Sequence, residues 1–197
     1  ECDIWSVPEG SVIFPYEPIM TVRGPAVQAQ LIETIALLII NHESLIATKS
    51  NRIKRAAKGR AVMEFGARRA QGIDASVYGA KASYIAGIDG TSNVLTGKLF
   101  NIPVLGTMAH SWVQMFDTEL EAFKAFAKSF PNNCVLLVDT YNTLQSGIPN
   151  AIKTFDEILK PMGIRPKGIR LDSGDLAYLS KQARKMLDNA GYEDAQI

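Results

Sequence analysis

The chain has 197 residues, of which 47% are hydrophobic and 21% are charged, a balance typical of a globular protein with a sizeable core. Its 21 Lys and Arg residues almost equal its 20 Asp and Glu residues, so bulk charge gives no support to nucleic-acid binding. Two cysteines, Cys2 and Cys134, are too few for a disulfide framework, and we expect a reducing, cytoplasmic setting. The longest apolar run, residues 35–40, is far shorter than the roughly 20 residues of a membrane span, so we expect no membrane partner.

The first 60 residues predict two segments. Residues 1–24 carry short alternating stretches interrupted by prolines, which predicts a β-ribbon and part of an N-terminal β-containing domain. Pro25 is tolerated in a first helical turn, and the apolar residues after it predict a long linking helix within residues 25–60. Because these apolar residues cover more than one face of the helix, we expect it to be central and buried.

From residue 61 onward, short apolar strands alternate with amphipathic helices. The expected strands are AVMEFG, GIDGTSN, IPVLGTM, CVLLVDTY and GIRLDSGD, and a helical pattern follows each of them. Thr118 and Glu121 form a capping box that predicts the start of the helix over residues 118–130. Successive β-then-α units predict parallel strands joined by right-handed crossovers. No G-x-G-x-x-G sequence marks a dinucleotide turn, and polar residues end strand after strand. We therefore favour an incomplete α/β barrel over residues 61–197 rather than an open doubly wound sheet.

The expected strand ends carry charged side chains that a parallel barrel would gather at one face. Asp139 and Asp172 follow neighbouring strands, and two adjacent carboxylates suit Mg²⁺, which prefers hard oxygen ligands. The alternative is that such aspartates cap the following helices, and for Asp175 we consider capping the better interpretation. Arg68 and Arg170 have planar guanidinium groups that fit carboxylate or phosphate. Either arginine could instead form an ion pair with a carboxylate such as that of Asp172.

Three further side chains allow more than one interpretation. Phe65 could stack on a flat ring, yet a single phenylalanine in a barrel strand is more often part of the core. His110, one of two histidines, could be a structural loop residue, a general acid or base, or a nucleophile that accepts a phosphoryl group. His42 lies within the long apolar helix and is most simply a hydrogen-bonded buried or interface histidine.

Five short motifs occur in an order that resembles one known family. They are EFGARR at 64–69, GTSN at 90–93, GTMAHSW at 106–112, LVDTYNT at 137–143 and IRLDSGDL at 169–176. Together they resemble nicotinate phosphoribosyltransferase, a type II phosphoribosyltransferase, over essentially the whole chain. The resemblance implies a partial (β/α) barrel and an ATP-coupled ligase and glycosyltransferase activity. Nicotinate would displace pyrophosphate from phosphoribosyl pyrophosphate to give nicotinate mononucleotide for NAD synthesis, with Mg²⁺ as the metal cofactor.

The resemblance also implies roles for individual residues. His110 matches the histidine that becomes a phosphohistidine when family members hydrolyse ATP. Phe65 would stack on the pyridine ring, and Thr107 would contact nicotinate. The remaining matches are Arg68, which would face the phosphate-bearing substrate, Arg170, which would contact nicotinate, and Asp139 and Asp172, which would lie near the ribose, the diphosphate and Mg²⁺.

Ser92 helps to separate this family from its close relatives. The similar nicotinamide enzyme has an aspartate at this position, and a serine suits the acid substrate because it does not repel a carboxylate. Quinolinate phosphoribosyltransferase shares the architecture but lacks the ATP-linked histidine, so the GTMAHSW motif argues against it. A nicotinamide-type or quinolinate-type relative is nevertheless kept as an alternative. Family members form dimers, which implies a homodimer.

The chain begins at ECDIW and stops at YEDAQI, and we expect it to be an internal piece of a longer protein. The N-terminal domain of the family and its later barrel strands would then lie outside these residues. Two other hypotheses stay open. One is a catalytically incomplete piece that binds ligand without turnover, and the other is an unrelated barrel lyase or isomerase that uses His110 as a base.

Overall fold

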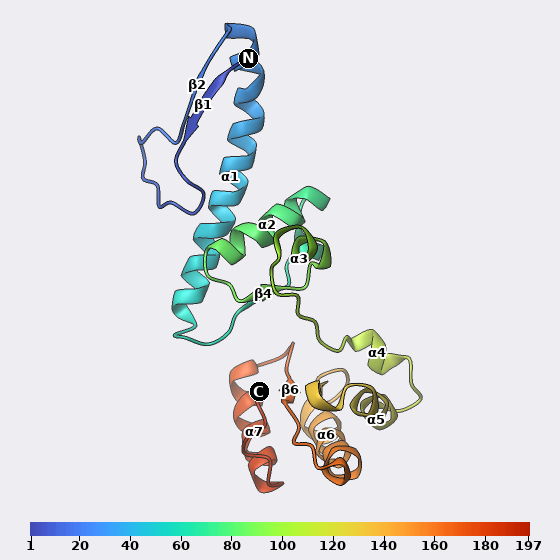
Figure 1. Ribbon diagram of the computed structural model, residues 1–197. Coiled ribbons are helices and arrows are strands. Elements are labelled where there is room, and N and C mark those ends of the chain that lie inside the picture. Colours follow the sequence, from blue (N-terminus) through green and yellow to red (C-terminus); the bar gives the residue numbers. More distant parts are fainter. The chain divides into compact units, whose positions relative to one another are not determined.

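The computed structural model describes all 197 residues and is a mixed α/β structure (Figure 1). The chain divides into two compact units, Glu1–Gly106 (unit 1) and Thr107–Ile197 (unit 2). Each unit contains one pair of parallel strands with helices around it, and the two units are described separately.

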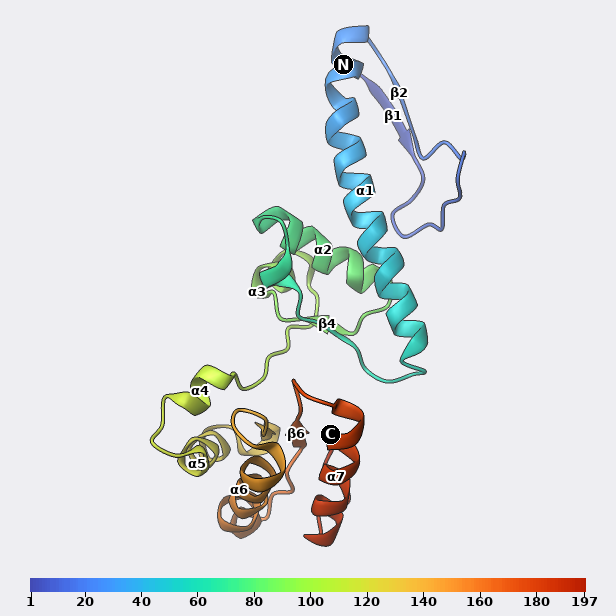
Figure 2. The ribbon, with the colours of Figure 1, turned by 180° about the vertical axis from the view of Figure 1, so that it is seen from behind.

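Unit 1 begins with the expected β-ribbon. β1 (Asp3–Ser6) and β2 (Met20–Arg23) pair in antiparallel fashion. α1 (Ala26–Ala56) follows as one continuous helix with Pro25 at its N-cap, so the predicted long helix is confirmed. Figures 1 and 2 show the ribbon beside the N-terminal half of α1, and α2 (Ile73–Ile85) beside its C-terminal half.

The prediction that this long helix is buried is wrong. Ser50, which contacts α2, is the single buried residue of α1, and residues such as Ile32 and Ile40 in its N-terminal half are only partly buried. The large exposed apolar side chains along the helix are Val27, Leu31, Ile35, Leu37, Leu38, Ile39, Leu45 and Ile53. By length and composition alone α1 could cross a membrane, since an 18-residue window has a mean hydropathy of 1.4 and none of it is buried, but a single such helix is weak evidence because core helices and signal sequences pass the same test.

The second half of unit 1 contains its parallel strand pair. β3 (Met63–Glu64) pairs with β4 (Gly90–Thr91), and Val104 adds an isolated parallel bridge to the far side of β4. The connection from β3 to β4 contains the short helix η1 (Ala67–Arg69) and then α2. α3 (Val94–Phe100) follows β4, so the β-then-α order predicted from the sequence is confirmed here.

Unit 2 is built around a second parallel pair, β5 (Val135–Leu137) and β6 (Gly168–Arg170). Its helices before and after this pair are α4 (His110–Gln114), α5 (Glu119–Ser129), η2 (Pro131–Asn133) and α7 (Leu176–Asn189). The connection between β5 and β6 is a continuous helical stretch, residues 143–162. It consists of η3 (Thr143–Gly147), α6 (Ile148–Thr154), η4 (Phe155–Leu159) and η5 (Lys160–Met162), of which η3 and η4 have π-helical hydrogen bonding.

Large apolar side chains from both strands and from the helices of unit 2 form one core. Those with essentially no exposed surface are Val113, Phe123, Leu136, Leu137, Val138, Ile148, Phe155, Leu159 and Leu187. Two predicted helix starts are confirmed by their caps. Thr118 Oγ1 accepts a hydrogen bond from the backbone N of Glu121 at 3.3 Å, and Asp175 Oδ1 accepts one from that of Tyr178 at 2.9 Å.

Gly147 allows this helical stretch to pass directly over the end of β5. A Cβ atom at this position would lie 1.8 Å from the carbonyl oxygen of Val138, which is a backbone atom that cannot rotate away. The backbone of Gly147 itself is ordinary helix, so the requirement for glycine comes from the contact and not from the torsion angles. The position of the residues that follow β5 therefore depends on this contact.

We expect Gly147→Ala to lower the free energy of unfolding of unit 2 by at least about 3 kcal/mol, because the methyl group would force the helix and strand apart. The measurement is urea unfolding followed by Trp112 fluorescence in a Trp5→Phe background, so that only unit 2 is observed. Gly106→Ala is the matched control, since a Cβ there has open space around it, and it should change the value by less than about 0.5 kcal/mol. Equal stabilities for the two variants would contradict the prediction.

Candidate active site

The residues predicted from the sequence lie in both units, and each set is described within its own unit. Unit 2 contains Thr107, His110, Asp139, Arg170 and Asp172, whereas unit 1 contains Phe65, Arg68 and Ser92.

The carboxylate of Asp139 is the centre of the unit 2 set. This residue follows β5, and its side chain is only 2% exposed. Its Oδ2 accepts hydrogen bonds from the backbone N of Asp172 at 2.9 Å and from Ser173 Oγ at 2.6 Å, while Oδ1 lies 3.2 Å from His110 Nε2. The prediction that Asp139 and Asp172 follow neighbouring strands is therefore confirmed, and the same carboxylate also holds the first residue of α4.

These hydrogen bonds determine the charge of Asp139. Burial by itself would raise the pKa of this carboxyl group, because it disfavours the charged form. The hydrogen bonds from Ser173, from the backbone of Asp172 and from His110 outweigh burial and hold the pKa of Asp139 below its usual value. The group is consequently a carboxylate at neutral pH, and it can only accept hydrogen bonds.

The capping interpretation is wrong for Asp139 and correct for Asp175. The helix after Asp139 is capped by Asn142, whose Oδ1 accepts a hydrogen bond from the backbone N of Gln145 at 2.9 Å. Asp175 caps α7, as predicted. The side chain of Asp139 is thus available to join the two strand ends and His110.

One ring nitrogen of His110 is hydrogen-bonded to Asp139, and the other has no hydrogen-bond partner. Because Asp139 is a carboxylate, Nε2 of His110 donates the hydrogen bond between them. Nδ1 has no hydrogen-bond partner within unit 2, and the side chain is 38% exposed. In the neutral ring Nδ1 therefore carries the free lone pair, which is suited to act as a nucleophile or a base.

Arg170 forms the ion pair that we weighed as an alternative to ligand binding. Its Nη2 lies 3.0 Å from Asp172 Oδ1, and its Nη1 donates a hydrogen bond to the carbonyl oxygen of Met108 at 3.1 Å. Arg170 thereby connects the end of β6 to the segment just before His110. The neighbouring Thr107 is exposed. No group of three or more His, Cys, Asp or Glu side chains in the chain is arranged to hold a metal ion, so a cation here would rely on two carboxylates.

The unit 1 set lies around the ends of β3 and β4. Phe65 is 40% exposed, so the interpretation of this ring as a core residue is wrong. Arg68 is exposed in η1 and forms no ion pair, which leaves its guanidinium group available to an anion. Ser92 is partly buried, and its backbone N donates a hydrogen bond to the carbonyl oxygen of Glu64 at 3.0 Å.

Sequence reasoning missed two residues that position these sets. Ser173 in the DSGD sequence donates to Asp139, and Glu64 in the EFGARR motif accepts hydrogen bonds from the backbone N of Gly66 and from Thr91 Oγ1. Both residues lie inside motifs that the sequence already singled out. The signal that could have found them is a polar side chain at a strand end, next to residues already assigned a role.

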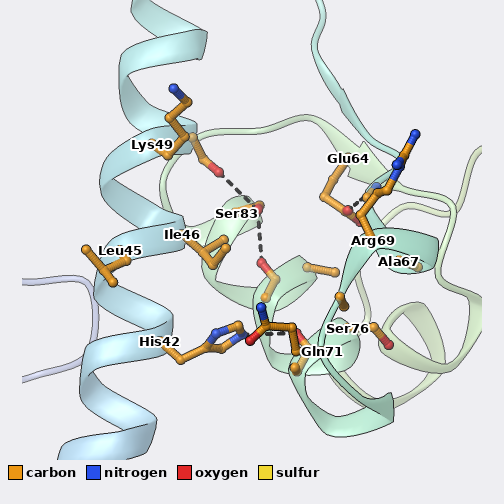
Figure 3. Close-up of a pocket in the computed structure, with 16 residues that line it drawn as sticks. His42, Leu45, Ile46, Lys49, Glu64, Ala67, Arg69, Gln71, Ser76 and Ser83 are labelled. Atoms are coloured by element: carbon orange, nitrogen blue, oxygen red, sulfur yellow. Dashed lines mark hydrogen bonds between the residues drawn. The ribbon is translucent and has the colours of Figure 1, made fainter.

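A cavity of about 460 Å³ lies in unit 1 between α1, α2 and the segment after β3 (Figure 3). His42 Nε2 is 3.1 Å from the carbonyl oxygen of Ala75, so the prediction of a hydrogen-bonded histidine is confirmed. Ser50 Oγ donates to Ser83 Oγ at 3.0 Å on the same wall. Glu64 borders the cavity on the opposite side.

Comparison with known proteins identifies the family. A sequence model described as the nicotinate phosphoribosyltransferase (NAPRTase) family matches residues 60–192. The chain belongs to the nicotinate phosphoribosyltransferase family. A second model, the N-terminal domain of quinolinate phosphoribosyl transferase, matches residues 1–44. The resemblance seen in the five motifs is confirmed.

Named relatives of this family match nearly the whole chain. The nicotinate phosphoribosyltransferase of Bacillus subtilis is 54% identical over 195 residues, which cover 98% of this chain and 39% of the relative. The human nicotinate phosphoribosyltransferase is 33% identical over 233 residues, covering 94% of this chain and 43% of the relative. The chain thus spans about two fifths of the length of these relatives.

Solved structures from the same group also match. The crystal structure of human nicotinic acid phosphoribosyltransferase has a TM-score of 0.89 and 33% identity, over 97% of this chain and 47% of that protein. The nicotinate-nucleotide pyrophosphorylase of Pyrococcus furiosus has a TM-score of 0.86 and 27% identity, over 100% of this chain and 50% of that protein.

We expect Asp139→Asn to lower the free energy of unfolding by about 2 to 4 kcal/mol at pH 7, because an amide cannot accept from all three donors. The pKa of Asp139 is lowered in the folded state, so its contribution is complete above the unfolded value near pH 4 and is lost as the pH falls through the folded value. The difference between variant and wild type should therefore shrink as urea unfolding is repeated from pH 7 towards pH 3.

Asp117→Asn is the matched control for this measurement. Asp117 is exposed and takes part in no hydrogen bond or ion pair of its side chain, so the substitution should change stability by less than about 0.5 kcal/mol at every pH. A pH-independent loss in Asp139→Asn would mean that the carboxylate charge is not what stabilises the strand ends.

Proposed function

We propose that this chain forms part of a nicotinate phosphoribosyltransferase that makes nicotinate mononucleotide and pyrophosphate from nicotinate and phosphoribosyl pyrophosphate, with coupled ATP hydrolysis, in NAD biosynthesis. The observation that carries the proposal is the hydrogen bond between His110, at the start of α4, and Asp139, which follows the parallel strand β5. A partly exposed imidazole held by a buried carboxylate is suited to accept a phosphoryl group. Family membership and the named relatives support the same conclusion.

The geometry of His110 suggests which atom accepts the phosphoryl group. Nδ1 would attack the γ-phosphorus of ATP, the bond from that phosphorus to the bridging oxygen would break, and ADP would leave. The ring becomes positively charged as the N–P bond forms, and the Asp139 carboxylate, 3.2 Å from Nε2, stabilises that charge. Transfer of the phosphoryl group to water would then restore the free histidine.

Mg²⁺ is the metal that the available ligands fit. Asp172 is partly exposed, and one of its carboxylate oxygens has no protein partner, whereas both oxygens of Asp139 are already hydrogen-bonded. We therefore assign Asp172 as the more accessible ligand and Asp139 as the group that orients it through its backbone N. A bound Mg²⁺ would neutralise charge on the diphosphate, and it commonly uses one or two carboxylates together with phosphate oxygens.

Recognition of nicotinate requires an aromatic face and cations. The exposed ring of Phe65 can stack on the pyridine, and Arg68 has a free guanidinium group for a phosphate-bearing substrate. Thr107 and Arg170 are assigned to nicotinate itself. The pyridine nitrogen attacks without losing a proton, so no general base is needed and catalysis depends on alignment and charge stabilisation.

The proposal also covers the fold of the barrel domain, the oligomeric state and the cellular location of the protein. The two parallel strand pairs with intervening helices support a partial (β/α) barrel of the type II phosphoribosyltransferase kind, and the TM-score of 0.89 to the human enzyme supports it further. We propose a homodimer in the cytoplasm for the natural protein that carries this sequence.

A quinolinate-type enzyme is the second candidate. It is favoured by the match of residues 1–44 to the N-terminal domain of quinolinate phosphoribosyl transferase and by the likeness to the Pyrococcus furiosus protein. It predicts product from quinolinate and no stimulation by ATP. A ligand-binding piece without turnover is the third candidate, because the chain spans only about two fifths of its relatives.

We expect the natural protein that carries this sequence to form nicotinate mononucleotide from nicotinate, phosphoribosyl pyrophosphate, ATP and Mg²⁺. His110→Ala should abolish ATP stimulation and the acid-labile phosphate label, because the acceptor nitrogen is gone. The product is followed by mass, and the label by γ-phosphate-labelled ATP.

His42→Ala is the matched control, since His42 lies on α1 and is bonded to a backbone carbonyl rather than to a carboxylate. It should keep both ATP stimulation and the label. Product from quinolinate in place of nicotinate would support the second candidate. Binding of nicotinate without product from either acid would support the third.

We expect Ser92→Asp to raise the KM for nicotinate by about tenfold or more, because a second carboxylate near the substrate carboxylate is repelled. Its effect on nicotinamide, which is uncharged, should be much smaller. The measurement is kcat/KM for both substrates, with Ser92→Asn as an uncharged control of similar size. Equal losses for Asp and Asn would show that size and not charge decides selectivity at this position.

A further inference from the structure

We infer that Glu64 is a positioning residue that holds Ser92 in place for the pyridine substrate and Arg68 in place for the phosphate-bearing substrate. The inference rests on the proposed function. It adds Glu64, a residue of the EFGARR motif to which the resemblance assigned no role. Both carboxylate oxygens of Glu64 bind loops that carry those two residues. Figure 3 shows Glu64 at the edge of the cavity with its carboxylate directed back towards the segment that leads into η1.

One oxygen of Glu64 fixes the start of η1. Oε1 accepts a hydrogen bond from the backbone N of Gly66, which is the N-cap residue of that short helix. Gly66 in turn accepts a hydrogen bond, through its carbonyl oxygen, from the backbone N of Arg69 at 2.8 Å. Because Arg68 lies between them, its backbone position is determined by this pair of bonds.

The other oxygen of Glu64 fixes the loop after β4. Oε2 accepts a hydrogen bond from Thr91 Oγ1 at 2.6 Å, and the Thr91 side chain, only 1% exposed as a residue, accepts one from the backbone N of Asn93 at 3.0 Å. The carbonyl oxygen of Glu64 also accepts from the backbone N of Ser92 at 3.0 Å. Ser92 is therefore bonded to the backbone of Glu64 and lies between Thr91 and Asn93, which the Glu64 carboxylate fixes through Thr91 Oγ1.

The two oxygens of the Glu64 carboxylate accept from both loops at once. Two donors, a backbone N–H and a hydroxyl, point at two separate oxygens, and each bond is strengthened by the negative charge. Glutamine would keep the shape but has one oxygen for two donors: with that oxygen at the N–H of Gly66, its NH₂ group would face Thr91 Oγ1, which could then no longer donate to residue 64. Glu64→Gln consequently tests the hydrogen bonds with little change in volume.

Gly66 offers an independent test of the same contact. Its φ of −87° and ψ of −3° are available to any residue, so alanine there is not excluded by backbone conformation. A Cβ atom would nevertheless lie 2.8 Å from Glu64 Oε1 and would displace the carboxylate. The effect of Gly66→Ala should therefore depend on whether residue 64 still has a long side chain.

The first experiment measures nicotinate and nicotinamide kinetics in the natural protein that carries this sequence, with and without Glu64→Gln. We expect the KM for nicotinate to rise about tenfold while kcat changes less than about threefold, because binding residues are displaced and the reacting groups are not. The preference for nicotinate over nicotinamide in kcat/KM should fall by a similar factor. Glu64→Asp, which keeps the charge but is one methylene shorter, should restore part of the loss.

Asp89→Asn is the matched control. Asp89 is also a carboxylate that accepts from a backbone N–H near β3, that of Val62 at 2.7 Å, but it touches neither substrate loop. It should leave the nicotinate preference unchanged even if the protein is less stable. An equal fall in preference for Asp89→Asn and Glu64→Gln would overturn the inference, since the effect would then be general destabilisation.

A double-mutant cycle gives the second readout. Gly66→Ala should raise the KM for nicotinate in the wild-type background and should add little in a Glu64→Ala background, where no carboxylate is left to displace. Additive effects would overturn the inference. A wild-type protein that makes no nicotinate mononucleotide would instead contradict the proposed function, and with it the substrate role of Glu64, so the two failures are distinguishable.

Discussion

The buried carboxylate of Asp139 is the constraint on which the rest of unit 2 depends. A charge that is almost removed from water is tolerated only when donors surround it. Here three donors come from two segments: the backbone N of Asp172 and Ser173 Oγ after β6, and His110 at the start of α4. Loss of any one donor would leave part of the charge unsatisfied. The same group therefore fixes the ends of both strands and selects the ring nitrogen that His110 keeps free.

Unit 1 uses the same solution with different residues. Glu64 ends the first strand of its parallel pair, as Asp139 follows the first strand of the pair in unit 2, and each carboxylate binds a side-chain hydroxyl from the neighbouring strand segment, Thr91 in one case and Ser173 in the other. In both units the same residue also accepts from a backbone N–H beyond the second strand: Glu64 through its carbonyl oxygen from Ser92, and Asp139 through its carboxylate from Asp172. The loops that follow the strands are thereby attached to the strands rather than left to their own conformational preferences.

Much of the secondary structure and strand order could be predicted from the sequence, because both follow from local residue patterns. The long helix, the parallel β-then-α order and the caps by Thr118 and Asp175 follow from periodicity and capping chemistry. The neighbouring positions of Asp139 and Asp172 followed from strand order. What local patterns could not supply was the partner of each polar group. Asn142 rather than Asp139 caps the next helix, because Asn142 lies three residues before Gln145 and its side-chain oxygen can accept a hydrogen bond from the backbone N of that residue.

Exposure was the other quantity that the sequence could not provide. An apolar stripe shows that a face suits burial, but whether the covering surface lies within these residues is a tertiary fact, and for most of α1 it does not. The interpretation of Phe65 as a core residue was wrong for the same reason. A phenylalanine at a strand end is apolar whether or not other side chains pack against it. Glu64 was overlooked because its neighbours in the motif had more obvious chemistry.

The close contact between Gly147 and Val138 has a mechanical consequence. With no room for even a methyl group between them, the end of β5 and the helical stretch of residues 143–162 must move as one rigid body. Ser146 and Asn150 on that stretch both donate to the buried Glu119, so α5 is drawn along with it. A displacement of Asp139, which follows β5, would thus be transmitted through this helical stretch to α5.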